Sequence, residues 1–299
     1  MSDIIVIALI PALMSIGIAA RHIGLKPIHL ERVIIYIALP ILLFTETMKI
    51  QLDSSVIGEI GLLSLVYLTL IFIASYIPTR RFEIREKGTI IFNTMFYNGI
   101  FLPFPLILAF YGDLSVAIII GVPLMIIRST LGTFLASYWG HGRAGKKFLL
   151  RALMFPPLWG FILGVLARPI FAAVVPSQIF DWLSTLGLLA IYLSMILAGL
   201  VIPLSKDSLL IFRNRVPGII TLYRFVVSPI LAIALIVLFN QVGLAKNSLL
   251  LNSFMPPGFT NTVIATSFGL DARATSQSIF LPTLLSLAII FALRFTAIL

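Results

Sequence analysis

Apolar residues run along this chain in long stretches that short polar segments separate. With roughly 20 apolar residues counted for each crossing of a bilayer, the pattern predicts ten membrane-spanning helices. It therefore favours an all-α integral membrane protein. The expected spans are Ile4–Ala20, Val33–Met48, Val56–Ile77, Gly88–Tyr111, Leu114–Tyr138, Leu158–Val175, Ile179–Leu204, Gly218–Phe239, Leu249–Phe268 and Thr275–Ile298.

Two of these stretches, Asn93–Asp113 and Asn252–Asp271, carry helix-breaking residues in mid-run. Proline removes a backbone donor and clashes with the preceding turn, and glycine loosens a helix further. Broken backbone is tolerated in a membrane only where protein buries it or where it lines a wet cavity. A matched pair of interrupted helices points to the binding site of a secondary transporter.

Composition supports the membrane assignment. The 299 residues are 60% hydrophobic and 11% charged, whereas soluble domains are about a quarter charged. The first apolar run follows Met-Ser-Asp and lacks the features of a signal peptide, so we expect it to be the first span. With no cysteine in the chain, disulfides, thiol catalysis and Cys-based metal sites are excluded.

The net charge of +10 reflects membrane topology rather than nucleic-acid binding, because the basic residues are concentrated in every second loop. Fifteen Lys and Arg residues fall in the loops after spans 1, 3, 5, 7 and 9, and three fall in the other loops. The positive-inside rule puts the richer loops in the cytoplasm and both termini outside. The fifteen are Arg21, Lys26, Arg32, Arg80, Arg81, Arg85, Lys87, Arg143, Lys146, Lys147, Arg151, Lys206, Arg213, Arg215 and Arg273, and the three are Lys49, Arg168 and Lys246.

Ten spans divide into five and five, and an odd-numbered half repeated in tandem must be inverted. Weak internal similarity supports halves at residues 1–147 and 148–299. The run Pro11–Arg21 resembles Pro157–Arg168, and each interrupted stretch ends in Gly and Asp, ten or eleven residues before Pro123 or Pro282. The sequence thus predicts a five-plus-five inverted repeat with broken, crossing fourth and ninth helices.

The chemistry is expected at the two breaks. A broken helix exposes free N–H groups on one half and free C=O groups on the other, and two helix N-termini that meet suit an anion such as a carboxylate. The alternative is a pair of ordinary proline kinks in which Asn and Thr satisfy the freed backbone. The candidate substrate-binding residues are Asn98, Gly99, Pro103, Pro105, Arg128, Pro256, Pro257, Gly258, Thr260, Asn261 and Thr262.

Ionisable residues within the spans are functional candidates by default. Arg128 is expected either to balance a substrate carboxylate or to cap the carbonyl ends of the broken helices. Arg224 and Arg294 are expected to reach the membrane faces by snorkelling, and Glu46 and Glu59 to be solvated near the outer ends of their helices.

Neither broken segment contains an acid within it, and the three histidines fall in cytoplasmic loops. An intramembrane protease or metalloenzyme needs His, Asp or Glu clusters at membrane depth. We therefore expect no enzyme activity, no metal and no cofactor.

The same residues carry a family resemblance. The run Asn98-Gly-Ile-Phe-Leu-Pro103-Phe-Pro105, ending in Phe110-Tyr-Gly112, resembles the fourth helix of the auxin efflux carrier family, which includes the plant PIN proteins. The run Pro256-Pro-Gly-Phe-Thr-Asn261 and the following Phe268-Gly-Leu-Asp271 are similar to that family's ninth helix and hairpin. The short loop at 140–147 is typical of prokaryotic members.

This resemblance implies a fold related to sodium/proton antiporters and bile-acid symporters. Helices 1, 2, 6 and 7 would form a scaffold, and helices 3–5 and 8–10 a moving transport domain, with a homodimer as the implied assembly. The family's crossing-helix Asn falls on Asn98 and its proline on Pro105. Thr260 and Asn261 stand where plant members carry a further proline, a departure that bears on the substrate, indole-3-acetate.

The resulting hypothesis is a plasma-membrane carrier that moves a small organic anion, a mono- or dicarboxylate, by alternating access. Export from a cell that is negative inside needs no coupling ion, because the potential supplies about 2.3 kcal/mol per charge per 100 mV. Uniport is the first mechanism. The alternatives are a sodium- or proton-coupled symporter and, in another class, a receptor that does not transport.

Overall fold

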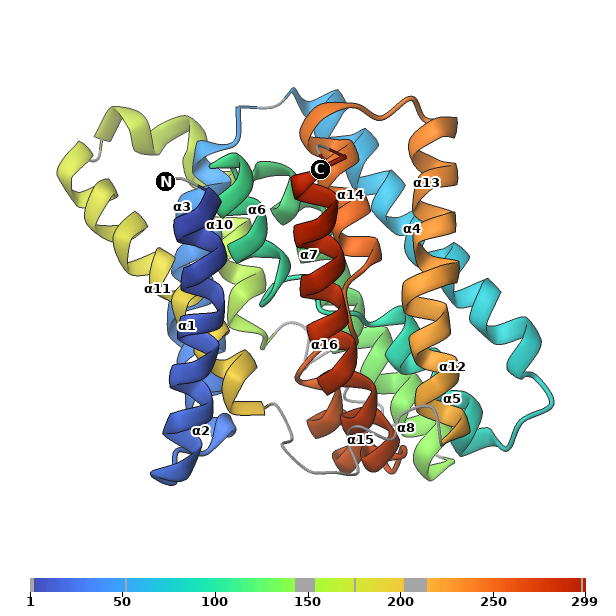
Figure 1. Cartoon of the computed structure of the whole chain (residues 1–299). Helices are drawn as coiled ribbons and strands as arrows, with labels where there is room; N and C mark the ends of the chain where they lie inside the picture. Colours follow the sequence, from blue (N-terminus) through green and yellow to red (C-terminus); the bar gives the residue numbers. More distant parts are fainter. Residues whose placement is uncertain (1–2, 52, 143–153, 175, 202–213, 297) are drawn as a thin grey trace. The chain divides into compact units, whose positions relative to one another are not determined.

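A computed structural model describes residues 3–51, 53–142, 154–174, 176–201, 214–296 and 298–299. These residues are helical and include no β-strand (Figure 1). Six helices in the described part are long and apolar enough to cross a bilayer, and shorter apolar helices accompany them. The six are Pro27–Lys49, Ser54–Thr79, Ser115–His141, Gln178–Val201, Arg215–Leu238 and Ala272–Phe295.

The all-helical membrane architecture is therefore confirmed, whereas the ten-span inverted repeat stays a prediction. Helices extend beyond several expected boundaries, since the second begins at Pro27 rather than Val33. Proline suits the first helical position, where its missing N–H has no intrahelical partner to lose. The expected boundary at 147 and 148 lies outside the described residues, as do Arg143, Lys146, Lys147, Arg151, Lys206 and Arg213.

The chain forms two compact units, each assembled from three stretches of sequence. The first unit comprises residues 1–58, 100–122 and 150–202, and the second comprises 59–99, 123–149 and 203–299. The assignment of scaffold and transport helices stays a prediction.

Closely packed helices build the first unit. Its helices are α1 (Asp3–His22), α2 (Pro27–Val33), η1 (Ile34–Ala38), α3 (Leu39–Lys49), α6 (Pro103–Tyr111), the start of α7 (Ser115–Ile127), α10 (Pro156–Val174) and α11 (Ser177–Val201). Glycines set the contact distances, because a Cβ at Gly199 of α11 would overlap the backbone of Met14 in α1. Gly160 of α10 lies equally close to Pro40 of α3. Small residues allow such close backbone approach in membranes.

The second unit carries three of the four helices that flank the interruptions, namely α5, α14 and α15. It consists of most of α4 (Ser54–Thr79), α5 (Ile84–Met95), η2 (Arg128–Gly132), α8 (Thr133–His141), α12 (Arg215–Leu222), η5 (Tyr223–Val227), α13 (Ser228–Leu238), α14 (Gly243–Ser253), α15 (Asn261–Phe268) and α16 (Ala272–Phe295), together with the end of α7. Here Gly88 of α5 packs on the Trp139 side chain, and Gly140 of α8 packs on the backbone of Phe268. The η elements are π-helical turns, a rare geometry that often marks functional positions.

The repeated Gly–Asp signal has a local explanation in both places. Gly112 and Gly269 end their helices with φ of 69° and 77°, in the left-handed region that glycine adopts readily. Asp113 accepts hydrogen bonds from the backbone N–H and the hydroxyl of Ser115, and Asp271 caps α16 by accepting from the N–H of Ala274. The motif thus stops one helix and starts the next.

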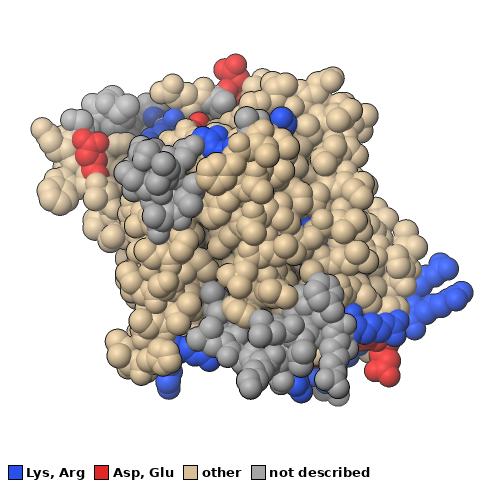
Figure 2. Space-filling model, in the orientation of Figure 1, with Lys and Arg blue, Asp and Glu red and all other residues tan. Residues whose placement is uncertain are grey.

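The molecular surface matches a membrane setting. On the face drawn in Figure 2 the visible Lys, Arg, Asp and Glu residues lie mostly toward the upper and lower edges of the view, and other residue types cover the surface between them. A surface band with few charged side chains suits a hydrocarbon environment.

Candidate functional site

Both interrupted stretches break where their prolines and glycines lie. Helix α5 ends at Met95 and α6 begins at Pro103, while α14 ends at Ser253 and α15 begins at Asn261. The intervening segments, residues 96–102 and 254–260, are largely buried. Buried non-helical backbone must find hydrogen-bond partners elsewhere.

The two breaks supply those partners to each other. Tyr97 and Pro257 form an isolated antiparallel bridge. The N–H of Asn98 donates to the carbonyl of Pro256 at 2.8 Å, and the N–H of Gly258 donates to the carbonyl of Phe96 at 3.1 Å. All of these residues belong to the second unit. The prediction that the breaks lie together is thereby confirmed at the level of the backbone.

Amide side chains extend this pairing. The fully buried Asn261 donates through Nδ2 to the carbonyl of Phe96 at 2.7 Å and to Oδ1 of Asn93 at 3.3 Å. Asn93 in turn donates to the Thr275 hydroxyl at 2.9 Å. Asn261 is therefore oriented with its nitrogen toward the backbone, and its oxygen remains for another contact.

Arg128 brings a positive charge to the same place. It begins the π-helical turn η2 and is partly exposed. A Cβ at Gly258 would lie 2.8 Å from Nη1 of Arg128 and 3.0 Å from Oδ1 of Asn261. The absence of a side chain at Gly258 is what lets the guanidinium approach the break so closely.

The N-terminus of α15 adds donors beside this cation. Thr260 is its N-cap residue, and no side-chain hydrogen bond caps the helix. The buried Thr260 hydroxyl and Oδ1 of Asn261 find no hydrogen-bond partner among the described residues. The first turn of a helix presents N–H groups without intrahelical partners, together with the positive end of the dipole.

The other half-helix is a poorer anion site. Helix α6 starts with Pro103 and Pro105, which have no N–H, and Phe104 donates its own N–H to Ile100 at 3.1 Å. At α15 the N–H of Asn261 is likewise occupied, since it donates to the carbonyl of Gly258 at 2.9 Å. No proline follows it in the first turn, so of the two N-termini expected to face an anion, α15 has the larger number of N–H groups.

The predicted site residues divide between the two units. The first unit holds Pro103 and Pro105, and the second unit holds Asn98, Gly99, Arg128, Pro256, Pro257, Gly258, Thr260, Asn261 and Thr262. Within the second unit, Gly99 lies against the Leu124 side chain rather than against a polar group. Asn98 is buried and Thr262 is partly exposed.

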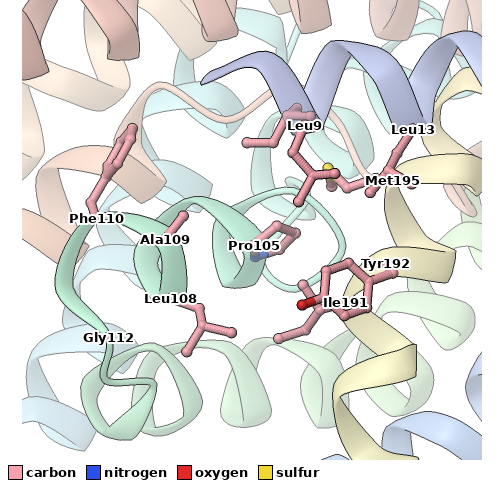
Figure 3. A pocket seen from close by; sticks show the side chains of 11 residues that line it. Leu9, Leu13, Pro105, Leu108, Ala109, Phe110, Gly112, Ile191, Tyr192 and Met195 are labelled. Carbon is pink, nitrogen blue, oxygen red and sulfur yellow. The ribbon is translucent and has the colours of Figure 1, made fainter. Parts of the chain in front are cut away.

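Pro105 lines an apolar cavity of the first unit with a volume of about 360 Å³. Side chains of α1, α6 and α11, among them Leu9, Pro105 and Ile191, face a common space there (Figure 3). No charged side chain lines it, and the hydroxyl of Tyr192 is the polar group of its lining side chains. This cavity suits an apolar group rather than a carboxylate.

Arg224 does not snorkel to the membrane face, contrary to expectation. Its side chain is fully buried and donates from Nε to the carbonyl of Met255 at 2.7 Å. Further bonds run to Asn252, Ser253 and Thr94 at 2.9, 3.2 and 3.3 Å. Arg224 therefore caps carbonyls at the breaks, a role that was expected of Arg128 as one of two alternatives. Hydrogen bonds to the freed carbonyls stabilise the guanidinium inside the protein. The sequence does not show this, because those carbonyls belong to segments far from Arg224 along the chain.

Glu46 also differs from its expected solvated state. It is 9% exposed and pairs with Lys49, one helical turn further along α3, at 2.5 Å. With Asp113 and Ser115 this pair lines a polar cavity of about 390 Å³ in the first unit. Glu59 meets the expectation better, since it lies in an exposed hydrogen bond with Gln241.

Comparison with known proteins gives the family. A family model described as "membrane transport protein" matches residues 26–293. The chain belongs to this family, the auxin efflux carriers. An uncharacterized transporter of Methanocaldococcus jannaschii is 31% identical over 96% of each chain. Another, from Methanothermobacter thermautotrophicus, is 28% identical over 86% of this chain and 85% of its own length.

Membership of the auxin efflux carrier family makes the chain a multi-pass membrane transporter. A receptor that binds without transport is accordingly not favoured. The family's proteins are transporters rather than enzymes.

Proposed function

We propose that the chain is a carrier for a small organic anion, and that the anion's carboxylate binds at the N-terminus of α15. The observation that carries this proposal is the position of Arg128, whose Nη1 would lie 2.8 Å from a Cβ at Gly258. The guanidinium, the first-turn N–H groups and the Thr260 hydroxyl together form a set of donors. Arginine and helix N-termini are the groups that recognise carboxylates in proteins.

Asn261 supports the same assignment through its orientation. Its Nδ2 donates to Phe96 and Asn93, so its Oδ1 faces Gly258. This oxygen can accept a hydrogen bond from a hydroxyl or N–H group of the substrate. Thr262, in the first turn of α15, adds a second hydroxyl. A site that combines a cation, donors and one acceptor suits a carboxylate with a neighbouring hydroxyl or N–H.

The wider mechanism that we propose is alternating access. Ten spans in two inverted halves, with helices 1, 2, 6 and 7 as scaffold, would let the remaining helices expose the site to each side in turn. The excess of Lys and Arg in the odd-numbered loops supports cytoplasmic loops there and termini outside. Uniport toward the outside, driven by the membrane potential, is the mechanism that we propose.

Thermal unfolding of the purified chain with a panel of organic acids tests the site. A ligand that binds only the folded state raises the transition temperature as its concentration exceeds Kd. We expect at least one carboxylic acid to stabilise the parent protein. Arg128→Gln should weaken that acid about ten-fold or more, because hydrogen bonds to charged groups contribute about 1.5–3 kcal/mol.

Arg294→Gln is the matched control, because Arg294 donates to the carbonyl of Leu299 near the C-terminus and leaves the anion site unchanged. Equal affinity in the parent, Arg128→Gln and Arg294→Gln would rule out the proposed carboxylate site. Counterflow of the same labelled acid in proteoliposomes then separates transport from binding alone.

A further inference from the structure

Arg224 is a buried cation at the breaks that takes no part in the proposed anion site. Arg224 lies in the π-helical turn η5 and its side chain has no exposed surface. Its guanidinium reaches the carboxyl ends of two half-helices at once, at Thr94 of α5 and at Asn252 and Ser253 of α14. The negative ends of two helix dipoles therefore converge on one positive charge.

Neighbouring groups hold this charge in position. The guanidinium carbon lies 4.5 Å from the ring centroid of Tyr97, the residue that pairs with Pro257 between the breaks. Ser228 donates to the carbonyl of Ser253 at 2.7 Å and shares a 2.5 Å hydrogen bond with the Tyr67 hydroxyl. Within the described residues no Asp or Glu forms a salt bridge with Arg224, so main-chain carbonyls are its principal electrostatic partners.

The arrangement resembles the environment of a coupling ion. In secondary transporters, the unwound backbone and the carboxyl ends of broken helices coordinate Na⁺ through carbonyl oxygens. Here carbonyls of the same origin accept hydrogen bonds from a side chain instead. A guanidinium supplies the positive charge that these oxygens require, but it cannot dissociate and carry the energy of an ion gradient.

We propose that Arg224 is a built-in cation that takes the place of a coupling sodium ion at the joined ends of α5 and α14. It acts as a positioning residue, because it fixes the two breaks from the carbonyl side without contacting the anion. The inference rests on the proposed carrier function, and it assigns the carrier to the sodium-independent class.

Chemical rescue of the purified full-length protein tests this assignment. Thermal unfolding is followed by the fluorescence of its three tryptophans. The buffers contain choline chloride, sodium chloride, or choline chloride with low-millimolar guanidinium chloride, all at the same ionic strength. The parent protein should show no shift specific to Na⁺. Arg224→Ala should unfold at a temperature lower by about 5 °C or more, and guanidinium should restore at least half of that loss.

Arg215→Ala serves as the control, because Arg215 belongs to the same unit and its side chain is 63% exposed. Guanidinium should not raise its transition temperature. Recovery of Arg224→Ala by guanidinium, without recovery of Arg215→Ala, marks a specific cation site rather than a general effect of the salt. The proposal is overturned if guanidinium leaves Arg224→Ala unchanged or if Na⁺ stabilises the parent protein over choline.

Arg224→Lys covers the case in which the alanine variant does not fold. It retains the charge with fewer directed donors, so we expect a folded, less stable protein that remains insensitive to Na⁺. A lysine variant that needs Na⁺ for its stability would overturn the proposal. Organic-acid binding is measured separately, so a failure of the anion site and a failure of the cation assignment give different results.

Discussion

The backbone N–H of Asn98 donates to the carbonyl oxygen of Pro256 over 2.8 Å. This bond joins two interrupted helices that lie far apart in the sequence. The joint has chemically different sides, because Arg224 binds carbonyls of α5 and α14 whereas Arg128 lies against Gly258, close to the start of α15.

Gly258→Ala should reduce anion affinity about ten-fold while the protein stays folded. The new Cβ would lie 2.8 Å from Arg128 Nη1 and 3.0 Å from Asn261 Oδ1, so the Arg128 guanidinium must move away and the buried Asn261 side chain must adjust slightly. Affinity measured by thermal shift with the acid found for the parent protein checks this. Gly58→Ala is the control, because its Cβ meets no atom within 4 Å and alanine favours a helix. Unchanged affinity in Gly258→Ala would contradict the placement of Arg128 in the site.

Transport of a monovalent anion should respond to the membrane potential. At 100 mV the potential contributes about 2.3 kcal/mol per charge, which corresponds to about a 50-fold accumulation ratio for uniport. A potassium gradient with valinomycin sets the potential in proteoliposomes, and the labelled acid is followed on both sides. Symport with one proton would be electrically neutral, and accumulation would then follow the pH gradient instead of the potential.

Single cysteines should report the topology without background, because the natural chain has none. A cysteine at Arg273, in the loop after the ninth expected span, should resist a membrane-impermeant maleimide in intact cells and react after lysis. A cysteine at Lys246, on the opposite side, should react in intact cells. The reverse pattern would mean that both termini lie in the cytoplasm.

Asp271→Ala should destabilise the second unit through loss of a helix cap. The Asp271 carboxylate accepts a hydrogen bond from the N–H of Ala274 at 2.9 Å, and such caps contribute about 1 kcal/mol. A fall of about 2–4 °C in the unfolding temperature is expected. Asp271→Asn, which retains a capping oxygen, should recover most of it. A fall of the same size in the asparagine variant would instead indicate that the negative charge matters.

Local sequence chemistry predicted the parts of the site that local rules control. Proline and glycine at 256–258 ended α14, and the Gly–Asp pairs formed hairpins, because backbone geometry and capping depend on neighbours in the chain.

Tertiary contacts set the rest, and these were not predictable from spacing. Arg224 and Arg128 lie in helices of similar apolar character, yet only the packing of η5 against α14 brings the former to the freed carbonyls. The burial of Glu46 similarly depends on its pairing with Lys49 and on the helices around α3. The start of α6 is poor in donors because Pro103 and Pro105, the residues that break the helix, have no backbone N–H.

Main-chain atoms alone make the bonds between residues 96 and 258 and between residues 98 and 256. Side chains at positions such as 260 and 262 can therefore be exchanged over evolutionary time without loosening the joint itself. Relatives that keep this main-chain pairing can therefore differ in the molecule that they transport, and family membership alone does not identify that molecule.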